Sequence, residues 1–213
     1  MKEFIFKEIR SEESNIHICS YADFDPMLHL ENLTPKEKEK MFSFRSATRK
    51  MEFVAARILR NRIFGLRDVL YLPDGSPYIE DDRHISISHS KNVAALAVNR
   101  SHKIGLDIEI PRDKILNLTD KFLSDQEKYN FDITDAKEVT KLWSVKEAFY
   151  KLADRKKIHF KTELQIEKDR NGNWQGKIVN SDHDLLVKIN IFELNDLIIC
   201  INAKELVKKH RNI

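Results

Sequence analysis

The sequence contains few of the residues that break or cross-link a chain. Its 213 residues include five glycines, five prolines and two cysteines. So few glycines and prolines argue against long flexible linkers, and we expect one large domain or two small ones. Cys19 and Cys200 lie far apart in apolar, strand-like runs and form neither a metal-binding spacing nor a disulfide framework. A reducing compartment is therefore the expected environment.

Long apolar runs are also missing. No apolar stretch approaches the roughly 20 residues that a helix needs to cross a bilayer. The first residues, Met1–Phe4, lack the organisation of a signal peptide. Apolar residues make up 41% of the chain and charged residues 33%, which is the balance of an ordinary soluble globular protein. We therefore expect a cytoplasmic protein that has no membrane partner.

Three common enzyme signatures are absent as well. The chain has no Gly-x-Ser-x-Gly turn of the hydrolase type, no Walker-type phosphate loop and no Gly-x-Gly-x-x-Gly dinucleotide fingerprint. A serine-hydrolase triad and nucleotide binding of those two kinds are therefore not indicated.

Positive charge is concentrated in one part of the chain, although the net charge is only +3. Nine Lys or Arg residues fall between Thr34 and Arg62, and only Glu37, Glu39 and Glu52 oppose them. Such a stretch attracts nucleic acids, anionic cofactors or acidic proteins, although a charge run alone is more often a solvated helix face. The chain lacks stacking aromatic runs and a nucleic-acid reading motif, so we expect no nucleic-acid partner.

Hydrophobic periodicity predicts helices mixed with hairpin-connected strands. Thr34–Glu37 has the composition of a helix start, and further helices are expected near Ser46–Phe64, Ser124–Tyr129 and Ala136–Ala153. The expected strands are Ile16–Cys19, His84–Ser88, Val93–Val98, Ile104–Ile110, Ile158–Glu167, Trp174–Val179, Leu185–Phe192 and Leu197–Ala203. The fold class predicted by this mixture is α+β with mainly antiparallel strands.

A polar break at Ser101–Lys103 separates two apolar strands and predicts a domain boundary. We expect an N-terminal half over residues 1–102 and a C-terminal half over residues 103–213. Helices and strands occur in both halves, but no sequence repeat is visible between them.

Two short segments carry most of the chemical information. In the strand Ile104–Ile110, Asp107 and Glu109 project from the same face, roughly 7 Å apart. Two carboxylates on one face repel each other unless a positive charge lies between them, and Mg²⁺ prefers such hard oxygen ligands. A solvated acidic strand face is the simpler alternative for this pattern taken alone.

The second segment is the helix around Trp143–Lys151. Trp143, Glu147 and Lys151 are four residues apart in turn, so they lie along one side of the helix. A surface Glu–Lys pair is the simple explanation. The functional alternative is that Glu147 reaches a metal or takes a proton while Lys151 stabilises phosphate charge.

A third segment, Ser88-His89-Ser90, is expected at a polar turn that follows a strand. Backbone N–H groups, hydroxyls and an imidazole in such a turn can bind a phosphate. An exposed histidine in a polar turn is the common alternative, and this segment alone is a weak signal.

Taken together, the motifs resemble the 4'-phosphopantetheinyl transferase superfamily. Gly105-Leu106-Asp107-Ile108-Glu109, followed by Trp143-Ser-Val-Lys-Glu-Ala-Phe-Tyr-Lys151, is similar to the paired signature of that family. The segment Ile85–Ser90 resembles a third motif, and Asp74–Pro77 resembles the family's Gly-Lys-Pro turn. The order and the spacing of all four motifs match, over roughly residues 34 to 153.

The resemblance implies a fold and a reaction. The length is similar to that of the larger, monomeric type, which has two similar α+β halves related by a pseudo-twofold and an active site in the cleft between them. The implied substrates are coenzyme A and an apo acyl or peptidyl carrier protein. The carrier serine would receive the 4'-phosphopantetheine arm in a Mg²⁺-dependent reaction, with Mn²⁺ as the alternative metal, and adenosine 3',5'-bisphosphate would leave.

Residue roles follow from the same resemblance. Asp107, Glu109 and Glu147 would bind the metal, and Glu147 would serve as third ligand, general base or both. Lys151 would neutralise charge at the diphosphate. The implied contacts to the coenzyme A phosphates are Lys40, Arg57, Ser88, His89 and Lys151.

One departure from the family pattern affects the phosphate or adenine side. Ser76 stands where the family usually has lysine in its Gly-Lys-Pro turn, which removes one expected contact. The alternative to an active enzyme is therefore a non-catalytic homologue that binds carrier proteins or nucleotides. The carrier protein and its pathway are not encoded in any motif that we recognise.

Overall fold

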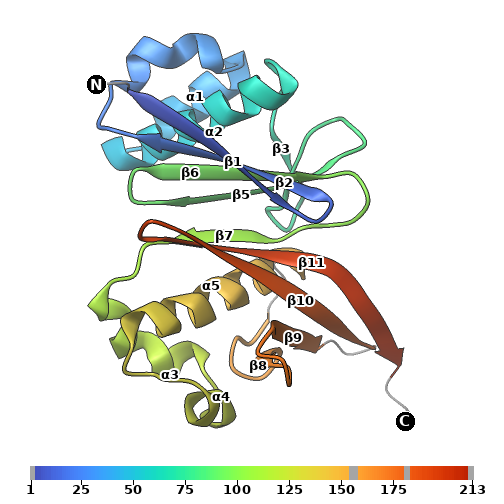
Figure 1. Cartoon of the computed structure of the whole chain (residues 1–213). Helices are drawn as coiled ribbons and strands as arrows, with labels where there is room; N and C mark the ends of the chain where they lie inside the picture. The colour runs from blue at the N-terminus through green and yellow to red at the C-terminus, as the bar shows by residue number, and fades with distance from the viewer. Residues whose placement is uncertain (1–2, 154–157, 180–182, 211–213) are drawn as a thin grey trace. The chain divides into compact units, whose positions relative to one another are not determined.

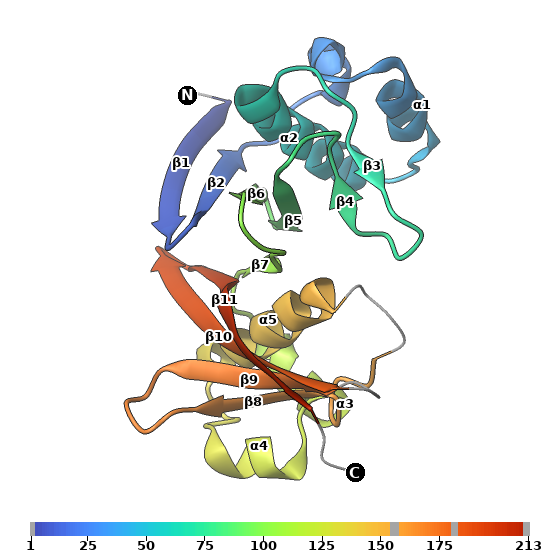
Figure 2. The same ribbon diagram turned by 90° about the vertical axis from the view of Figure 1, so that its right-hand side faces the viewer.

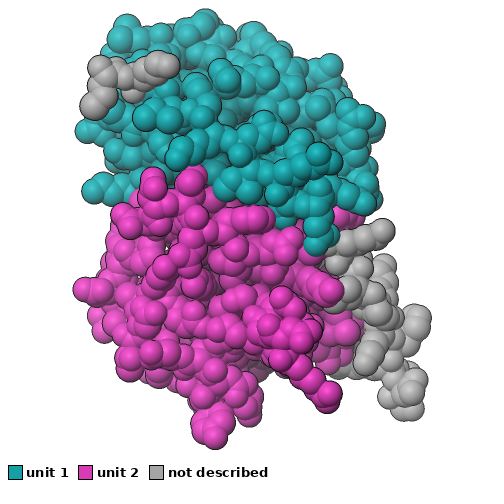
Figure 3. Space-filling model, in the orientation of Figure 1, with its two compact units in different colours: residues 1–73, 77–101 teal, residues 74–76, 102–213 magenta. Residues whose placement is uncertain are grey.

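The computed structural model describes residues 3–153, 158–179 and 183–210 (Figure 1). The chain folds into two compact units, which Figure 3 shows in two colours. Unit 1 comprises residues 1–73 and 77–101, and unit 2 comprises residues 74–76 and 102–213. No helix in the described part of the chain is both long enough and apolar enough to cross a membrane.

Unit 1 is a four-stranded sheet with helices. Its strands lie in the order β1-β2-β6-β5, every pair is antiparallel, and α2 packs against β6 in an apolar core (Figure 2). A separate two-stranded hairpin pairs β3 with β4. The elements are β1 Phe4–Ser11, β2 Ser14–Tyr21, η1 Pro26–Asn32, α1 Pro35–Ser43, α2 Ala47–Phe64, β3 Leu70–Tyr71, β4 Pro77–Tyr78, β5 His84–Ser90 and β6 Val93–Asn99.

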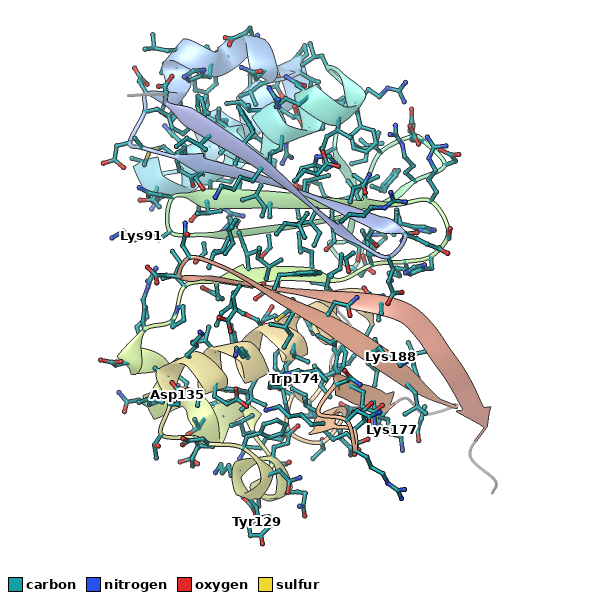
Figure 4. The ribbon with its side chains drawn as sticks, viewed as in Figure 1. Lys91, Tyr129, Asp135, Trp174, Lys177 and Lys188 are labelled. Atoms are coloured by element: carbon teal, nitrogen blue, oxygen red, sulfur yellow. The ribbon has the colours of Figure 1, made fainter. Side chains whose placement is uncertain are left out.

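Unit 2 is a five-stranded antiparallel sheet with one long helix packed on it. The strand order is β7-β11-β10-β9-β8, and α5 lies across the sheet (Figures 1 and 2). Asp135, labelled in Figure 4, caps α5 because its carboxylate accepts a hydrogen bond from the backbone N–H of Lys137. The elements are β7 Leu106–Glu109, η2 Asp113–Leu118, α3 Thr119–Phe122, α4 Asp125–Asn130, α5 Ala136–Leu152, β8 Leu164–Lys168, β9 Trp174–Val179, β10 His183–Leu194 and β11 Leu197–His210.

The α+β prediction is confirmed, and the expected long helices are present. Several strand limits differ from the prediction. The strand expected to begin at Ile158 begins at Leu164, because residues 160–163 form a turn. β1 was not predicted. Its partly buried residues pack against the core from the sheet edge and leave only a weak alternation.

The two units share an order of elements. In each, a strand is followed by a 3-10 segment, one or two short helices, a long helix and four further strands. The last strand of each unit pairs with an early one, as β6 pairs with β2 and β11 pairs with β7. The pseudo-twofold expected from the family resemblance stays a prediction.

A buried glutamate is a further common feature. In unit 1, Glu37 closes a capping box with Thr34 at the start of α1 and binds Arg57 and Arg60 of α2. In unit 2, Glu127 closes a capping box with Ser124 at the start of α4. Each glutamate also accepts a backbone N–H from a later segment of its unit. One carboxylate therefore links a short helix to more distant parts of its unit.

Candidate active site

The carboxylates of β7 face the helix α5. Asp107 lies opposite Cys200 of β11, and Glu109 lies opposite Ile198. Directly opposed residues of an antiparallel pair project from the same face, and Ile198 and Cys200 belong to the core that contains α5. The predicted alternation is therefore present, but Asp107 is only 5% exposed. The alternative of a solvated acidic face does not describe Asp107.

Gly105 explains how α5 comes so close to this strand. A Cβ atom at Gly105 would lie 2.0 Å from the backbone oxygen of Ala148 in α5. Real Cβ atoms do not approach an oxygen so closely, so only glycine allows the observed packing. The residue that begins the Gly-Leu-Asp-Ile-Glu motif thus allows contact between the two motif-bearing elements.

Lys151 joins these elements directly. Its Nζ atom donates to Oδ1 of Asp107 at 2.8 Å and to the backbone oxygen of Leu106 at 2.7 Å. The side chains are 12% and 7% exposed, so solvent screens the ion pair weakly. Two residues predicted from separate motifs are therefore in contact.

Glu109 borders a cavity of about 210 Å³ within unit 2. Trp143 and Thr140 of α5 contribute to its wall, as do Arg112 and Ile115 from the segment after β7. The wall combines an aromatic ring and aliphatic groups with charges of both signs. The first residue of the helix motif therefore lies at the same cavity as the second strand carboxylate.

The donor chemistry of these residues fits Mg²⁺, but the structure does not gather three carboxylates. Within the described ranges, no group of three or more His, Cys, Asp or Glu side chains is placed to hold a metal ion. Mg²⁺ often takes only one or two carboxylates and completes its shell with phosphates and water. Glu147 is half-exposed on α5, and its role as a third ligand stays a prediction.

Lys146 is a residue of the helix motif to which the sequence pattern gave no role. Its side chain is fully buried, and its Nζ atom donates to the Glu127 carboxylate at 2.8 Å. Burial lowers the pKa of Lys146, while the charge of Glu127 acts in the opposite direction. Glu127, three residues after the capping serine, was a sequence signal that could have pointed to this pair.

The model of one known family matches this part of the chain. Residues 103–201 match the family model described as the 4'-phosphopantetheinyl transferase superfamily. This segment is therefore similar to that superfamily. No curated protein matches the chain.

The transferase match contains one group of predicted site residues. Asp107, Glu109, Glu147 and Lys151 lie inside it, and Lys40, Arg57, Ser88 and His89 lie outside it. Phosphopantetheinyl transferases use coenzyme A as a substrate, generally with a divalent metal, and act on carrier proteins. The family prediction is confirmed for this segment, and the roles of individual residues stay predictions.

Ser88 and His89 of unit 1 lie within strand β5, whereas His89 was expected in the following turn. The turn begins only after Ser90, because Ser90 of β5 still pairs with Val93 of β6. Ser88 is buried, while the His89 side chain is 38% exposed.

His89 takes part in a small charged cluster with α2. Its Nε2 atom lies 2.6 Å from Nη1 of Arg49, and its Nδ1 atom lies 3.5 Å from Oε1 of Glu52. Arg49 also binds Glu52 at 3.1 Å. The cluster places a guanidinium beside the predicted phosphate-binding histidine, which the sequence did not indicate.

The two predicted phosphate contacts from the basic stretch differ in their surroundings. Lys40 is exposed, and its Nζ atom lies 4.3 Å from the centre of the Tyr71 ring. Arg57 is only 2% exposed and donates from Nε to Glu37 at 2.8 Å and from Nη2 to Tyr71 at 3.1 Å. Arg57 thus has a structural role in unit 1, because it neutralises a buried carboxylate.

Ser76 is buried within the turn where the transferases usually carry lysine. Its backbone N–H binds Oδ1 of Asp74 at 2.8 Å, and its hydroxyl oxygen has no hydrogen-bond partner among the described residues. A buried hydroxyl cannot supply the positive charge of the lysine that it replaces.

Proposed function

We propose that this protein transfers the 4'-phosphopantetheine arm of coenzyme A to a serine of an apo acyl or peptidyl carrier protein. The observation that carries the proposal is the transferase match over residues 103–201, with Lys151 bound to Asp107 inside it. The two halves of the paired motif lie on β7 and α5, which pack together in one unit. A chance occurrence of two short motifs would not require such contact.

The proposed reaction needs positioning more than covalent participation by the protein. The serine Oγ forms a bond to the β-phosphorus of coenzyme A, on the pantetheine side. The phosphorus–oxygen bond of the diphosphate bridge breaks, and its electron pair leaves with adenosine 3',5'-bisphosphate. The serine proton passes to a base, for which Glu147 is the proposed residue because it is half-exposed beside Lys151 on α5.

Charge neutralisation is the second requirement. Asp107 and Glu109 would hold the divalent cation, with Glu147 as the third candidate ligand, and a bound cation would offset the charge of the diphosphate. Lys151 supplies a positive charge at the same strand. In unit 1, Lys40 and His89 are the proposed contacts to the remaining phosphates, and Ser88 is a weaker candidate because it is buried.

Mass spectrometry of carrier proteins tests the proposal. The purified chain, coenzyme A and Mg²⁺ are incubated with a panel of apo-carriers from fatty-acid, polyketide and peptide synthesis. The active pair should gain about 340 Da, the mass of the phosphopantetheine group. Omitting Mg²⁺ and adding a chelator should abolish the gain.

Variants link the result to the site. Asp107→Ala should abolish transfer and keep the fold, which circular dichroism would check. Asp120→Ala is the matched control, because Asp120 is an exposed carboxylate that pairs with Lys128 on the surface. Transfer by Asp107→Ala at the wild-type rate would remove Asp107 from the site. Carrier binding without a mass gain for any carrier would instead favour the non-catalytic alternative.

A further inference from the structure

The ammonium group of Lys146 is completely enclosed by protein acceptors. It donates to the backbone oxygen of Phe122 at 2.7 Å, to Oε2 of Glu127 at 2.8 Å and to the backbone oxygen of Phe160 at 2.6 Å. A lysine ammonium has three N–H donors, and these three acceptors use them all. The side chain is 0% exposed. Lys146 therefore has no donor left for a substrate phosphate in this arrangement.

Aromatic rings of α5 contact the same two phenylalanines. The Trp143 ring lies 5.2 Å from the Phe122 ring at 76° and 5.7 Å from the Phe160 ring at 24°. Tyr150 lies 5.5 Å from Phe160. The helix thus holds the segment before it by Phe122 and the segment after it by Phe160, through both ring packing and hydrogen bonds.

Helix geometry relates these contacts with Phe122 and Phe160 to the proposed site. Successive residues of an α-helix are about 100° apart around its axis, so the direction of Lys146 sets that of Glu147. Lys151 follows on the next turns and reaches Asp107. A small rotation of α5 would move the Lys151 side chain away from Asp107 and would turn Glu147 with it. An error of about 1 Å in position can cost about 100-fold in rate.

Unit 1 contains a comparable arrangement. Arg57 and Arg60 of its long helix α2 bind Glu37, which closes the capping box of α1 as Glu127 closes that of α4. The backbone N–H of Val69 binds Glu37, and that of Ile166 binds Glu127. A buried glutamate that binds a cation of the long helix is therefore found in both units among the described residues.

We propose that Lys146 is a positioning residue that fixes the rotation of α5 and so aims Glu147 and Lys151. This inference rests on the proposed function only for the role of those two side chains. The motif Trp-x-x-Lys-Glu-x-x-x-Lys then has two tasks. Trp143 and Lys146 hold the helix in place, and Glu147 and Lys151 act on the reacting groups.

The test removes both buried charges together. Lys146→Met alone would leave Glu127 buried without its cation, and that variant could fail to fold. The double variant Lys146→Met/Glu127→Gln keeps the size of both side chains and carries no uncompensated charge. Its kcat should fall about 10- to 100-fold. Its KM for coenzyme A should change by a smaller factor than kcat, because the proposed phosphate contacts Lys40 and His89 lie on other elements and only Lys151 lies on α5.

A spectroscopic readout follows the helix independently of activity. The chain has two tryptophans, so Trp174→Phe leaves Trp143 as the sole tryptophan. Trp174 stacks on Phe131, and phenylalanine preserves that contact (Figure 4 labels Trp174). In this background the double variant should shift the emission of Trp143 to longer wavelength and lower its anisotropy, because Phe122 and Phe160 lose their common anchor.

Ile178→Ala is the control for general destabilisation. Ile178 is buried in the same core on β9, and its truncation lowers the melting temperature without touching the Lys146 contacts. It should leave kcat unchanged at temperatures where the variant is folded. An equal loss of kcat in Ile178→Ala would overturn positioning, as would wild-type kcat in the double variant.

Two further outcomes separate this inference from the proposed function. Loss of kcat with unchanged Trp143 emission would mean that Lys146 acts on the substrate, which overturns a positioning role. If the wild type transfers nothing to any carrier, the proposed function fails. The emission of Trp143 still tests whether Lys146 holds α5. An unchanged emission spectrum in the double variant would show that it does not.

Discussion

At the residue scale, the charged residues of the two motifs differ mainly in their burial and in the groups that they contact. Asp107 and Lys151 form a shielded ion pair, while Glu109 borders a cavity and Glu147 is half-exposed. The alternation along β7 and the helical spacing on α5 were readable from the sequence. The pairing of Asp107 with Lys151 was not, because it depends on where the helix crosses the strand.

Gly105 leads to a prediction at this scale. Gly105→Ala should lower the free energy of unfolding by about 2 kcal/mol, because its Cβ would press on the backbone oxygen of Ala148. Urea unfolding measures the loss. Gly172→Ala is the control: Gly172 has φ +81° and open space around its Cβ position, so only backbone strain of about 1 kcal/mol is expected. An equal or larger loss at Gly172 would contradict the close-packing argument.

At the element scale, the short helices α1 and α4 are each linked to the rest of their unit by the glutamate of their capping box. The pattern Thr34-x-x-Glu37 predicted a helix start from the sequence, and the structure confirms it. The same glutamate binds two arginines of α2, which no local pattern could show. Those contacts also remove Arg57 and Arg60 from the exposed basic surface.

Glu37 gives a prediction about pH. Burial alone would raise its pKa, but the hydrogen bond from Arg60 and the charges of Arg57 and Arg60 lower it below 4.5. A lowered pKa in the folded state means that this stabilisation is complete above about pH 4.5 and is lost as the pH falls through the folded-state value. Glu37→Gln should cost about 3 kcal/mol at pH 7, because two buried arginines lose their anion.

Urea unfolding at several pH values checks this expectation. The difference in unfolding free energy between wild type and Glu37→Gln should shrink as the pH falls below about 4.5. The control is Glu39→Gln, since Glu39 is exposed on the same helix. A difference that stays constant from neutral to acidic pH would show that Glu37 does not stabilise unit 1 as an anion.

At the scale of the whole molecule, the basic stretch contains fewer surface cations than the sequence indicated. Arg57 and Arg60 are buried with Glu37, and the remaining lysines and arginines of this stretch are exposed or half-exposed on α1, α2 and their connection. Those charges remain available to an acidic partner. Carrier proteins are generally acidic, so we propose that this region assists their docking.

Salt dependence tests the docking proposal. The KM for the carrier should rise severalfold between about 0.05 M and about 0.5 M NaCl, because salt screens exposed charges. Lys38→Ala/Arg45→Ala/Lys50→Ala should raise KM at low salt and flatten this dependence. The control Lys121→Ala/Arg170→Ala/Lys188→Ala removes three charges from unit 2 and should behave as wild type (Figure 4 labels Lys188). A KM that does not change with salt would exclude electrostatic docking.

The sequence by itself determined the α+β class, the helix starts, the alternation of β7 and the similarity of residues 103–201 to the transferase superfamily. These features depend on local periodicity, capping and motif order, which are readable along the chain. Only the tertiary structure decided which charges meet: Asp107 with Lys151, Lys146 with Glu127, and Arg57 with Glu37. The reason is that partners far apart in sequence meet only where packed elements cross. From the sequence alone, the acidic strand and the Glu–Lys helix are each explained by a solvated surface. In the structure, the two elements are in contact where α5 packs on Gly105.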